Sequence, residues 1–134
     1  MIVIYTSPGC VSCNKVRKWL KDHSLVYIEK NIFNTLLKRE EIKYILSRCE
    51  NGTDDIISKR SKIMIEGKID IEQMTVEQLI DFIVENPSIL KRPIIISEES
   101  FQVGYDADEI DILEMVKEQR EEIELDYYIN KNNI

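Results

Sequence analysis

The chain has 134 residues and a net charge of −7, and 43% of its residues are hydrophobic. This length fits one domain with room for a packed core, and the chain lacks the apolar run of about 18 residues that a membrane span needs. The three cysteines, two of them in a Cys-x-x-Cys pair, fit a reducing compartment better than a disulfide-rich secreted scaffold, so we expect a cytoplasmic protein.

The charge is unevenly distributed. Residues 98–126 carry twelve acidic side chains against Lys117 and Arg120, whereas residues 1–97 are close to balanced. An acidic C-terminal quarter repels phosphate, so we do not expect the chain to bind DNA by itself. A solvated helix face followed by a tail is the simplest account of these charges.

The apolar run over residues 2–5 predicts a buried strand rather than a signal peptide. Cys10 and Cys13 follow it, at the start of a predicted helix whose apolar residues repeat at helical spacing from Val16 to Leu20. A second strand is expected soon after this helix, over residues 25–29. So short a strand–helix–strand unit predicts a parallel pair of strands.

The position of the two cysteines favours dithiol chemistry. A helix N-terminus stabilises a thiolate, so we expect Cys10 to be acidified, and the spacing places Cys13 one turn along, within reach of a disulfide. Such an arrangement is typical of a thioredoxin-like redox motif. The alternatives are two structural thiols or half of a zinc site, for which only Cys49 and His23 remain as ligands. We expect neither a metal nor a cofactor.

Helical spacing predicts a further helix over residues 38–50, with Cys49 on its apolar face as a small core residue. Asn51-Gly52 would stop this helix, because glycine readily adopts the left-handed conformation found at helix C-termini. Thr53 can then cap a short segment that turns Ile56 and Ile57 inward.

Thr75 and Gln78 form a capping-box pattern that predicts the start of a helix ended by Pro87. A strand over residues 92–96 and its hairpin partner over residues 101–103 follow. We expect a last helix from near Asp106. Its apolar face would carry Ile110, Leu113 and Val116.

This element order predicts an α/β fold: a thioredoxin-like mixed sheet (βαβ … ββα) with a helical insertion over about residues 32–90. We expect one domain over residues 1–120. Residues 121–134 are acidic and then rich in asparagine, and we expect them to be frayed. Pro93, which opens the third strand, stands where thioredoxin folds place a cis-proline, but the sequence does not fix its isomer.

Five sequence blocks, in register over about residues 1–110, resemble the arsenate-reductase-like ArsC/Spx family. They span residues 5–13, 29–33, 51–61, 92–96 and 102–105. The blocks are most similar to the transcriptional regulators of this family. The resemblance implies binding to the C-terminal domain of the RNA polymerase α subunit, contact with DNA only through the polymerase, and a role in thiol and oxidative stress.

The resemblance also assigns roles to individual residues. It makes Cys10 and Cys13 a redox switch, and it makes Gly52 the position at which the α subunit docks. Arg92 and Arg60 would be coupled to the switch. From the residues alone, Gly52 is equally a helix C-cap and the two arginines are equally surface charges.

Two departures from the family pattern affect these roles. Where the regulators carry an arginine shortly before the glycine, this chain has Ser47 and then Arg48, so we assign the polymerase contact to Arg48. The family resemblance implies turnover by Clp protease and its adaptor through the C-terminus. The segment from Asp111 onward differs from the family C-terminus and does not support this expectation.

Two enzymatic functions remain as alternatives. An arsenate reductase would use a thiolate with several cations around the oxyanion, and Cys10, Arg60 and Arg92 could supply part of that set. The reductases, however, have a serine at the position of Cys13 and a further arginine where this chain has Val103-Gly104-Tyr105. The other alternative is a general thiol–disulfide oxidoreductase, which an insulin-reduction assay would identify.

Overall fold

The computed structural model describes residues 1–106, 110 and 112–132. A four-stranded mixed sheet lies at its centre, in the order β2-β1-β3-β4. The strands are β1 (Ile2–Thr6), β2 (Tyr27–Asn31), β3 (Ile94–Ile96) and β4 (Phe101–Val103). β1 and β2 are parallel, as predicted, whereas β3 is antiparallel to both β1 and β4.

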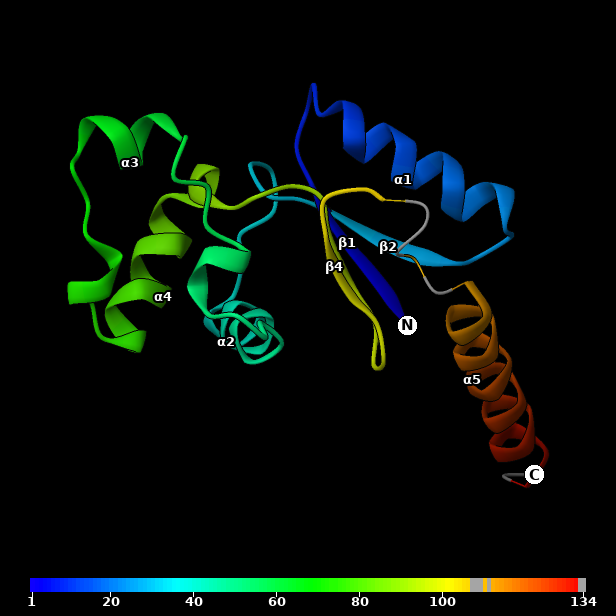
Figure 1. Cartoon of the computed structure of the whole chain (residues 1–134). Coiled ribbons are helices and arrows are strands. Elements are labelled where there is room, and N and C mark those ends of the chain that lie inside the picture. The colour runs from blue at the N-terminus through cyan, green and yellow to red at the C-terminus, as the bar shows by residue number, and fades with distance from the viewer. Residues whose placement is uncertain (107–109, 111, 133–134) are drawn as a thin grey trace.

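Five α-helices surround the sheet: α1 (Val11–Asp22), α2 (Arg39–Ser47), α3 (Lys62–Glu66), α4 (Val76–Glu85) and α5 (Ile112–Asn132). Three 3₁₀ turns, η1 (Thr53–Asp55), η2 (Ile71–Gln73) and η3 (Pro87–Ile89), connect the helices between β2 and β3. Figure 1 shows α2, α3 and α4 gathered on one side of the sheet, with α1 and α5 on the other. The thioredoxin-like fold with inserted helices is therefore confirmed.

The alternation of side chains along the strands divides the core in two. Ile2 and Ile4 of β1 point to the side of α1, where they pack with Trp19 and Leu20 and with Met115 of α5. The alternate residues of β1 and β3 point to the other side. They meet the inserted helices through Tyr5, Ile94 and Ile96.

The start of α4 matches its sequence signature. Thr75 Oγ1 accepts a hydrogen bond from the Gln78 amide at 3.1 Å, and Gln78 Oε1 accepts one from the Thr75 amide at 2.9 Å. The short elements α3 and η2 were not predicted, because neither is long enough to show a helical period.

Helix α2 ends earlier than predicted, at Ser47 rather than near residue 50. The amides of Arg48 and Cys49 bond back only three residues, to Ile45 and Leu46, which closes the helix with a tight turn. Gly52 is therefore not the C-cap of α2, and that interpretation is wrong. Gly52 instead precedes η1, at φ 86° and ψ −166°.

Helix α5 also differs from expectation, because it continues as a helix to Asn132 where we expected fraying from residue 121. Its first half is anchored on the domain: Gln119 bonds the backbone of Val26, and Glu122 pairs with the N-terminal ammonium group. The second half extends away from the sheet (Figure 1). Two predictions for this helix stay untested. Its predicted start, near Asp106, adjoins residues 107–109, which are outside the described residues, and so is the side chain of Leu113.

No helix among the described residues combines the length and the apolar character that crossing a membrane requires.

Candidate redox site and adjoining surface

The two cysteines of the motif are joined in a disulfide at the N-terminus of α1, with their Cα atoms 5.2 Å apart. Cys10 is the N-cap residue, and its Sγ accepts a hydrogen bond from the Cys13 amide at 3.2 Å. Cys13 is fully buried, whereas Cys10 is partly exposed. An incoming thiol can therefore reach only Cys10, and Cys13 is placed to leave or to resolve.

A pocket of about 500 Å³ opens beside Cys10. Lys91 and Arg92 contribute the cations of its lining, and the other lining residues carry no carboxylate. The helix N-terminus and these two cations all favour a negative charge on the Cys10 sulfur in the reduced protein. Val103 and Gly104 also line this pocket.

Arg92 is held in place by backbone acceptors of the preceding turn. Its Nη1 donates to the carbonyl oxygens of Leu90 at 3.0 Å and Ser88 at 3.3 Å. The guanidinium also lies 5.5 Å from the centre of the Phe33 ring. Partial burial lowers the pKa of Arg92 from its usual value. The Arg92–Pro93 bond is cis.

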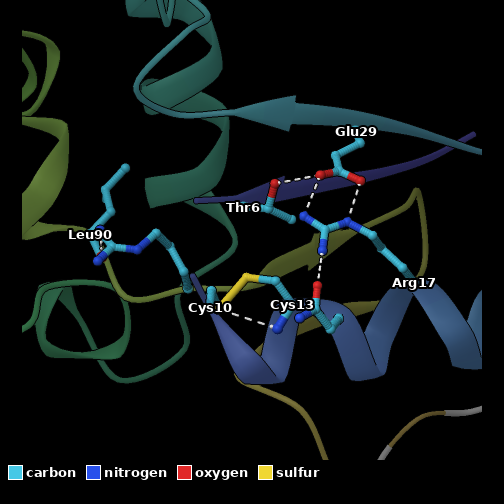
Figure 2. Close-up of a disulfide and its surroundings, with 8 residues drawn as sticks. Thr6, Cys10, Cys13, Arg17, Glu29 and Leu90 are labelled. Atoms are coloured by element: carbon cyan, nitrogen blue, oxygen red, sulfur yellow. Dashed lines mark hydrogen bonds and ion pairs between the residues drawn. A yellow bond between two sulfur atoms is a disulfide. The ribbon is translucent and has the colours of Figure 1, made fainter. Parts of the chain in front are cut away.

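One turn beyond Cys13, Arg17 forms a polar cluster with Glu29 of β2 and Thr6 of β1, which we call the Arg17 clamp. Arg17 Nε and Nη2 each donate to a different oxygen of Glu29 at 2.7 Å, and Thr6 Oγ1 donates to the same carboxylate at 2.8 Å. Figure 2 shows the clamp beside the Cys10–Cys13 disulfide. The hydrogen bonds between the two charged groups raise the pKa of Arg17 and lower that of Glu29.

Gly52 lies on the rim of a second pocket, of about 610 Å³, whose floor includes Met64, Ile69 and Ile71. A Cβ built on Gly52 would meet no atom within 4 Å, so the space above this glycine is open. The backbone conformation itself is one that only glycine adopts readily.

A band of four cationic residues, which we call the basic band, connects the two pockets and consists of Lys59, Arg60, Lys91 and Arg92. The Asp54 carboxylate lies among them and pairs with Lys59 at 3.5 Å. Arg60 is exposed and lines a third pocket together with Lys59, which also lines the Gly52 pocket, and Lys91, which also lines the Cys10 pocket. The Lys91 Nζ donates to the Asp54 carbonyl at 2.8 Å. An antiparallel bridge between Ile57 and Leu90 joins the underlying backbone segments. The structure thus brings Cys10, Arg92, Arg60 and Gly52 onto one surface.

Arg48 differs from these residues because its guanidinium is bound within the molecule. Its Nη1 donates to the Ser97 carbonyl at 2.6 Å and to the Tyr44 hydroxyl at 2.8 Å. It also stacks over the rings of Tyr44 and Phe101. A partner would have to compete with these contacts to use Arg48.

Cys49 lies apart from the disulfide. Its thiol is half-buried and donates to the Ile45 carbonyl at 3.4 Å, and burial raises its pKa to about 11. Among the described residues, no group of three or more His, Cys, Asp or Glu side chains is arranged to hold a metal ion.

The clamp and Lys91 were not predicted from the sequence, because nothing local connects Arg17 to Glu29. Lys91 could have been found from its position next to Arg92 and Pro93, where any side chain must lie near the start of β3.

The profile of the ArsC family matches residues 5–113 of the chain. The global transcriptional regulator Spx of Listeria innocua is 49% identical over 110 residues, which cover 82% of this chain and 84% of that protein. The protein of the same name from Bacillus subtilis is 48% identical over the same shares of both chains.

Solved structures show the same fold at lower identity. A putative ArsC-family-related protein from Bacteroides fragilis superposes with a TM-score of 0.70 at 24% identity, over 81% of this chain and 92% of that one. An arsenate reductase from Vibrio cholerae gives a TM-score of 0.68 at 18% identity, over 76% and 87% of the two chains.

Proposed function

The chain belongs to the ArsC family, and from this premise we propose that it is a redox-responsive transcriptional regulator that docks on the C-terminal domain of the RNA polymerase α subunit. The names of its Spx relatives support the regulatory part of this proposal. The dithiol pair supports the redox part.

The observation that carries the proposal is the basic band between Cys10 and Gly52. Lys91 and Arg92 both line the pocket beside Cys10, so in this proposal their positive charges favour a thiolate on Cys10 in the reduced protein. Oxidation consumes that charge by forming the disulfide. Because Lys91 also bonds the backbone at Asp54, the change reaches the turn that contains Gly52.

In this proposal the partner docks over Gly52, where the open space admits a close approach. Arg60 lies on the same surface, and we assign it and Arg92 to the coupling between redox state and docking. Contact with DNA then comes through the polymerase, which agrees with the acidic C-terminal region.

The test is a binding titration in which the purified C-terminal domain of the α subunit is added to the reduced and to the oxidised protein. We expect the two dissociation constants to differ by about 5- to 150-fold, the usual range for coupled sites. Cys10→Ser supplies the control, since it cannot form the disulfide and should give one affinity under both conditions. Absence of binding in either redox state would refute the proposed partner.

An arsenate reductase is the second candidate, because the Cys10 pocket holds two cations and the fold is shared with the Vibrio cholerae enzyme. Two features count against it. Cys13 diverts an oxidised Cys10 into an internal disulfide. In addition, the family resemblance places the reductases' further arginine where this chain has Val103-Gly104-Tyr105, which offers no cation to the oxyanion.

A further inference from the structure

The Arg17 clamp begins one helical turn after Cys13 on α1. Cys13 and Arg17 are four residues apart on this helix, so their side chains leave it on the same face, with Cβ atoms about 5–6 Å apart. Both ions of the clamp are in partial contact with water, with side-chain exposures of 28% for Arg17 and 29% for Glu29. Thr6, which donates to Glu29, is fully buried.

Cys13 is also the sulfur that must accept charge when the disulfide is reduced. The thiolate of an external dithiol attacks Cys10 Sγ and forms a mixed disulfide, which breaks the Cys10–Cys13 bond. The electron pair of that bond goes to Cys13 Sγ, which then takes a proton from water. The second thiol of the reagent loses its proton to the hydroxide left by that water and attacks the mixed disulfide, so Cys10 leaves as a thiolate and the reagent as a cyclic disulfide.

Arg17 by itself would stabilise the charge on Cys13, because a cation one turn away attracts a thiolate in a buried site. Glu29 opposes this effect, since its carboxylate is bound to the guanidinium through two parallel hydrogen bonds. The depressed pKa of Glu29 keeps this carboxylate ionised at neutral pH.

We propose that Glu29 is a positioning residue of the redox switch: by neutralising Arg17, it keeps Cys13 protonated in the reduced protein and leaves the negative charge on Cys10. This inference rests on the redox chemistry of the proposed function. It adds to that function a residue that determines which of the two cysteines carries the negative charge.

The other charged groups near the pair lie elsewhere. On α1, Lys21 acts on Glu29 at longer range than Arg17 does. On the connection that leads into β3, Lys91 and Arg92 line the pocket of Cys10, where they stabilise charge on Cys10 rather than on the buried Cys13. β1 contributes only the Thr6 hydroxyl to the clamp. Of these charged groups, the clamp is therefore the one that can change the stability of a thiolate on Cys13.

Variants that remove one charge of the clamp at a time distinguish an electrostatic effect on Cys13 from a loss of helix packing. Glu29→Gln leaves an uncompensated cation beside Cys13, so the leaving thiolate is stabilised and reduction is faster. Arg17→Gln leaves an uncompensated carboxylate, so reduction is slower. Loss of packing alone would change both rates in the same direction, because both variants break the same pair of hydrogen bonds.

The assay is the rate of disulfide reduction by dithiothreitol, an uncharged dithiol, on the full chain in a Cys49→Ala background. We expect an increase of about threefold for Glu29→Gln and a similar decrease for Arg17→Gln, the change that one pKa unit produces at a Brønsted coefficient near 0.5. Arg17→Lys keeps the charge and should lie within about twofold of the parent. Lys18→Gln and Asp22→Asn break an exposed ion pair of the same helix and serve as matched controls.

A second readout follows the ionisation of Cys13 directly. In the reduced Cys10→Ser protein, the thiolate absorbance near 240 nm should appear at lower pH when Glu29 is also replaced by glutamine. This titration decides the question even where Arg17→Gln does not fold.

Rates that change in the same direction, rates that do not change, or Arg17→Lys behaving like Arg17→Gln would each overturn the inference while leaving the proposed function intact. A disulfide that cannot be reduced and re-formed at all would overturn both.

Discussion

Substitution of Gly52 by arginine tests whether this residue contributes to partner binding independently of its effect on the stability of the fold. The backbone at φ 86° and ψ −166° lies in a region that is essentially restricted to glycine, so any side chain there costs of order 1–3 kcal/mol. A Cβ at this position meets no neighbouring atom, so no clash within the molecule adds to that cost. Against a domain stability of about 5–15 kcal/mol, the variant should remain folded.

The effect on binding should be much larger than the effect on the fold. An arginine side chain fills the open space above the turn, and a bulky side chain at the centre of an interface destroys shape complementarity. We expect the affinity for the C-terminal domain of the α subunit to fall by about 30-fold or more, which corresponds to about 2 kcal/mol. Circular dichroism checks the fold, and isothermal titration calorimetry measures the binding.

Gly52→Ala is the matched control, because it carries the same backbone cost with only a methyl group in the open space. It should lose stability like the arginine variant and retain most of the binding. An arginine variant that binds within about threefold of the parent would remove Gly52 from the interface. Equal loss of binding in both variants would assign the effect to the backbone and not to a close approach.

Three further predictions concern the cysteines and the clamp. Mild treatment with diamide should remove two free thiols, those of Cys10 and Cys13, and leave Cys49 titratable by mass spectrometry, since its raised pKa keeps it a neutral thiol; a mixed pairing with Cys49 would count against the switch. With glutathione and glutaredoxin the protein should not reduce arsenate, and turnover on the order of 1 s⁻¹ would replace the regulator proposal with an enzyme. The clamp should stabilise the fold above the ordinary Glu29 pKa of 4.5 and lose this contribution as the pH falls through the lower folded value. Glu29→Gln should therefore flatten the decline of the free energy of unfolding as the pH falls below 4.5, as measured by urea denaturation, and an unchanged slope would contradict this assignment.

The parts of the fold that the sequence predicted well are those determined by near neighbours. The first strand, the cysteine pair and α1 follow one another directly, and the capping box at Thr75 is a contact between residues three apart. The hairpin of β3 and β4 likewise closes through a short turn, in which the Ser97 amide donates to the Ser100 carbonyl at 2.8 Å. Local propensity and tertiary structure agree at all of these positions.

The end of α2 shows where this approach fails. The apolar period continues to Cys49, so the pattern extends the helix, whereas the structure ends it at Ser47. The Arg48 guanidinium donates to the carbonyl oxygen of Ser97, a residue that follows the helical insertion in the sequence. A tertiary contact of this kind cannot be seen in the periodicity of the sequence. Because the helix ends at Ser47, Gly52 lies in an open turn and does not cap the helix.

The sequence proposed the residues of the candidate site, whereas their spatial connections are visible only in the structure. Cys10, Arg60, Arg92 and Gly52 came from the motif and the family resemblance, yet nothing in the sequence places them on a common surface. The connection depends on the antiparallel bridge between Ile57 and Leu90, which brings two segments of the chain together. The Arg17 clamp depends in the same way on the register of β2 against β1.

Lys91 is the residue at which these connections meet. Its ammonium group bonds the backbone at Asp54, two residues from Gly52, while its side chain lines the pocket of Cys10. In the proposed function, a negative charge on Cys10 attracts a cation that is already attached to the turn on which the partner docks. Because coupling free energies are reciprocal, the proposal requires that a partner bound at Gly52 shift the redox equilibrium of the cysteine pair by the same factor by which oxidation changes its affinity. The partner would then act on the oxidation state of the protein as much as the oxidation state acts on the partner.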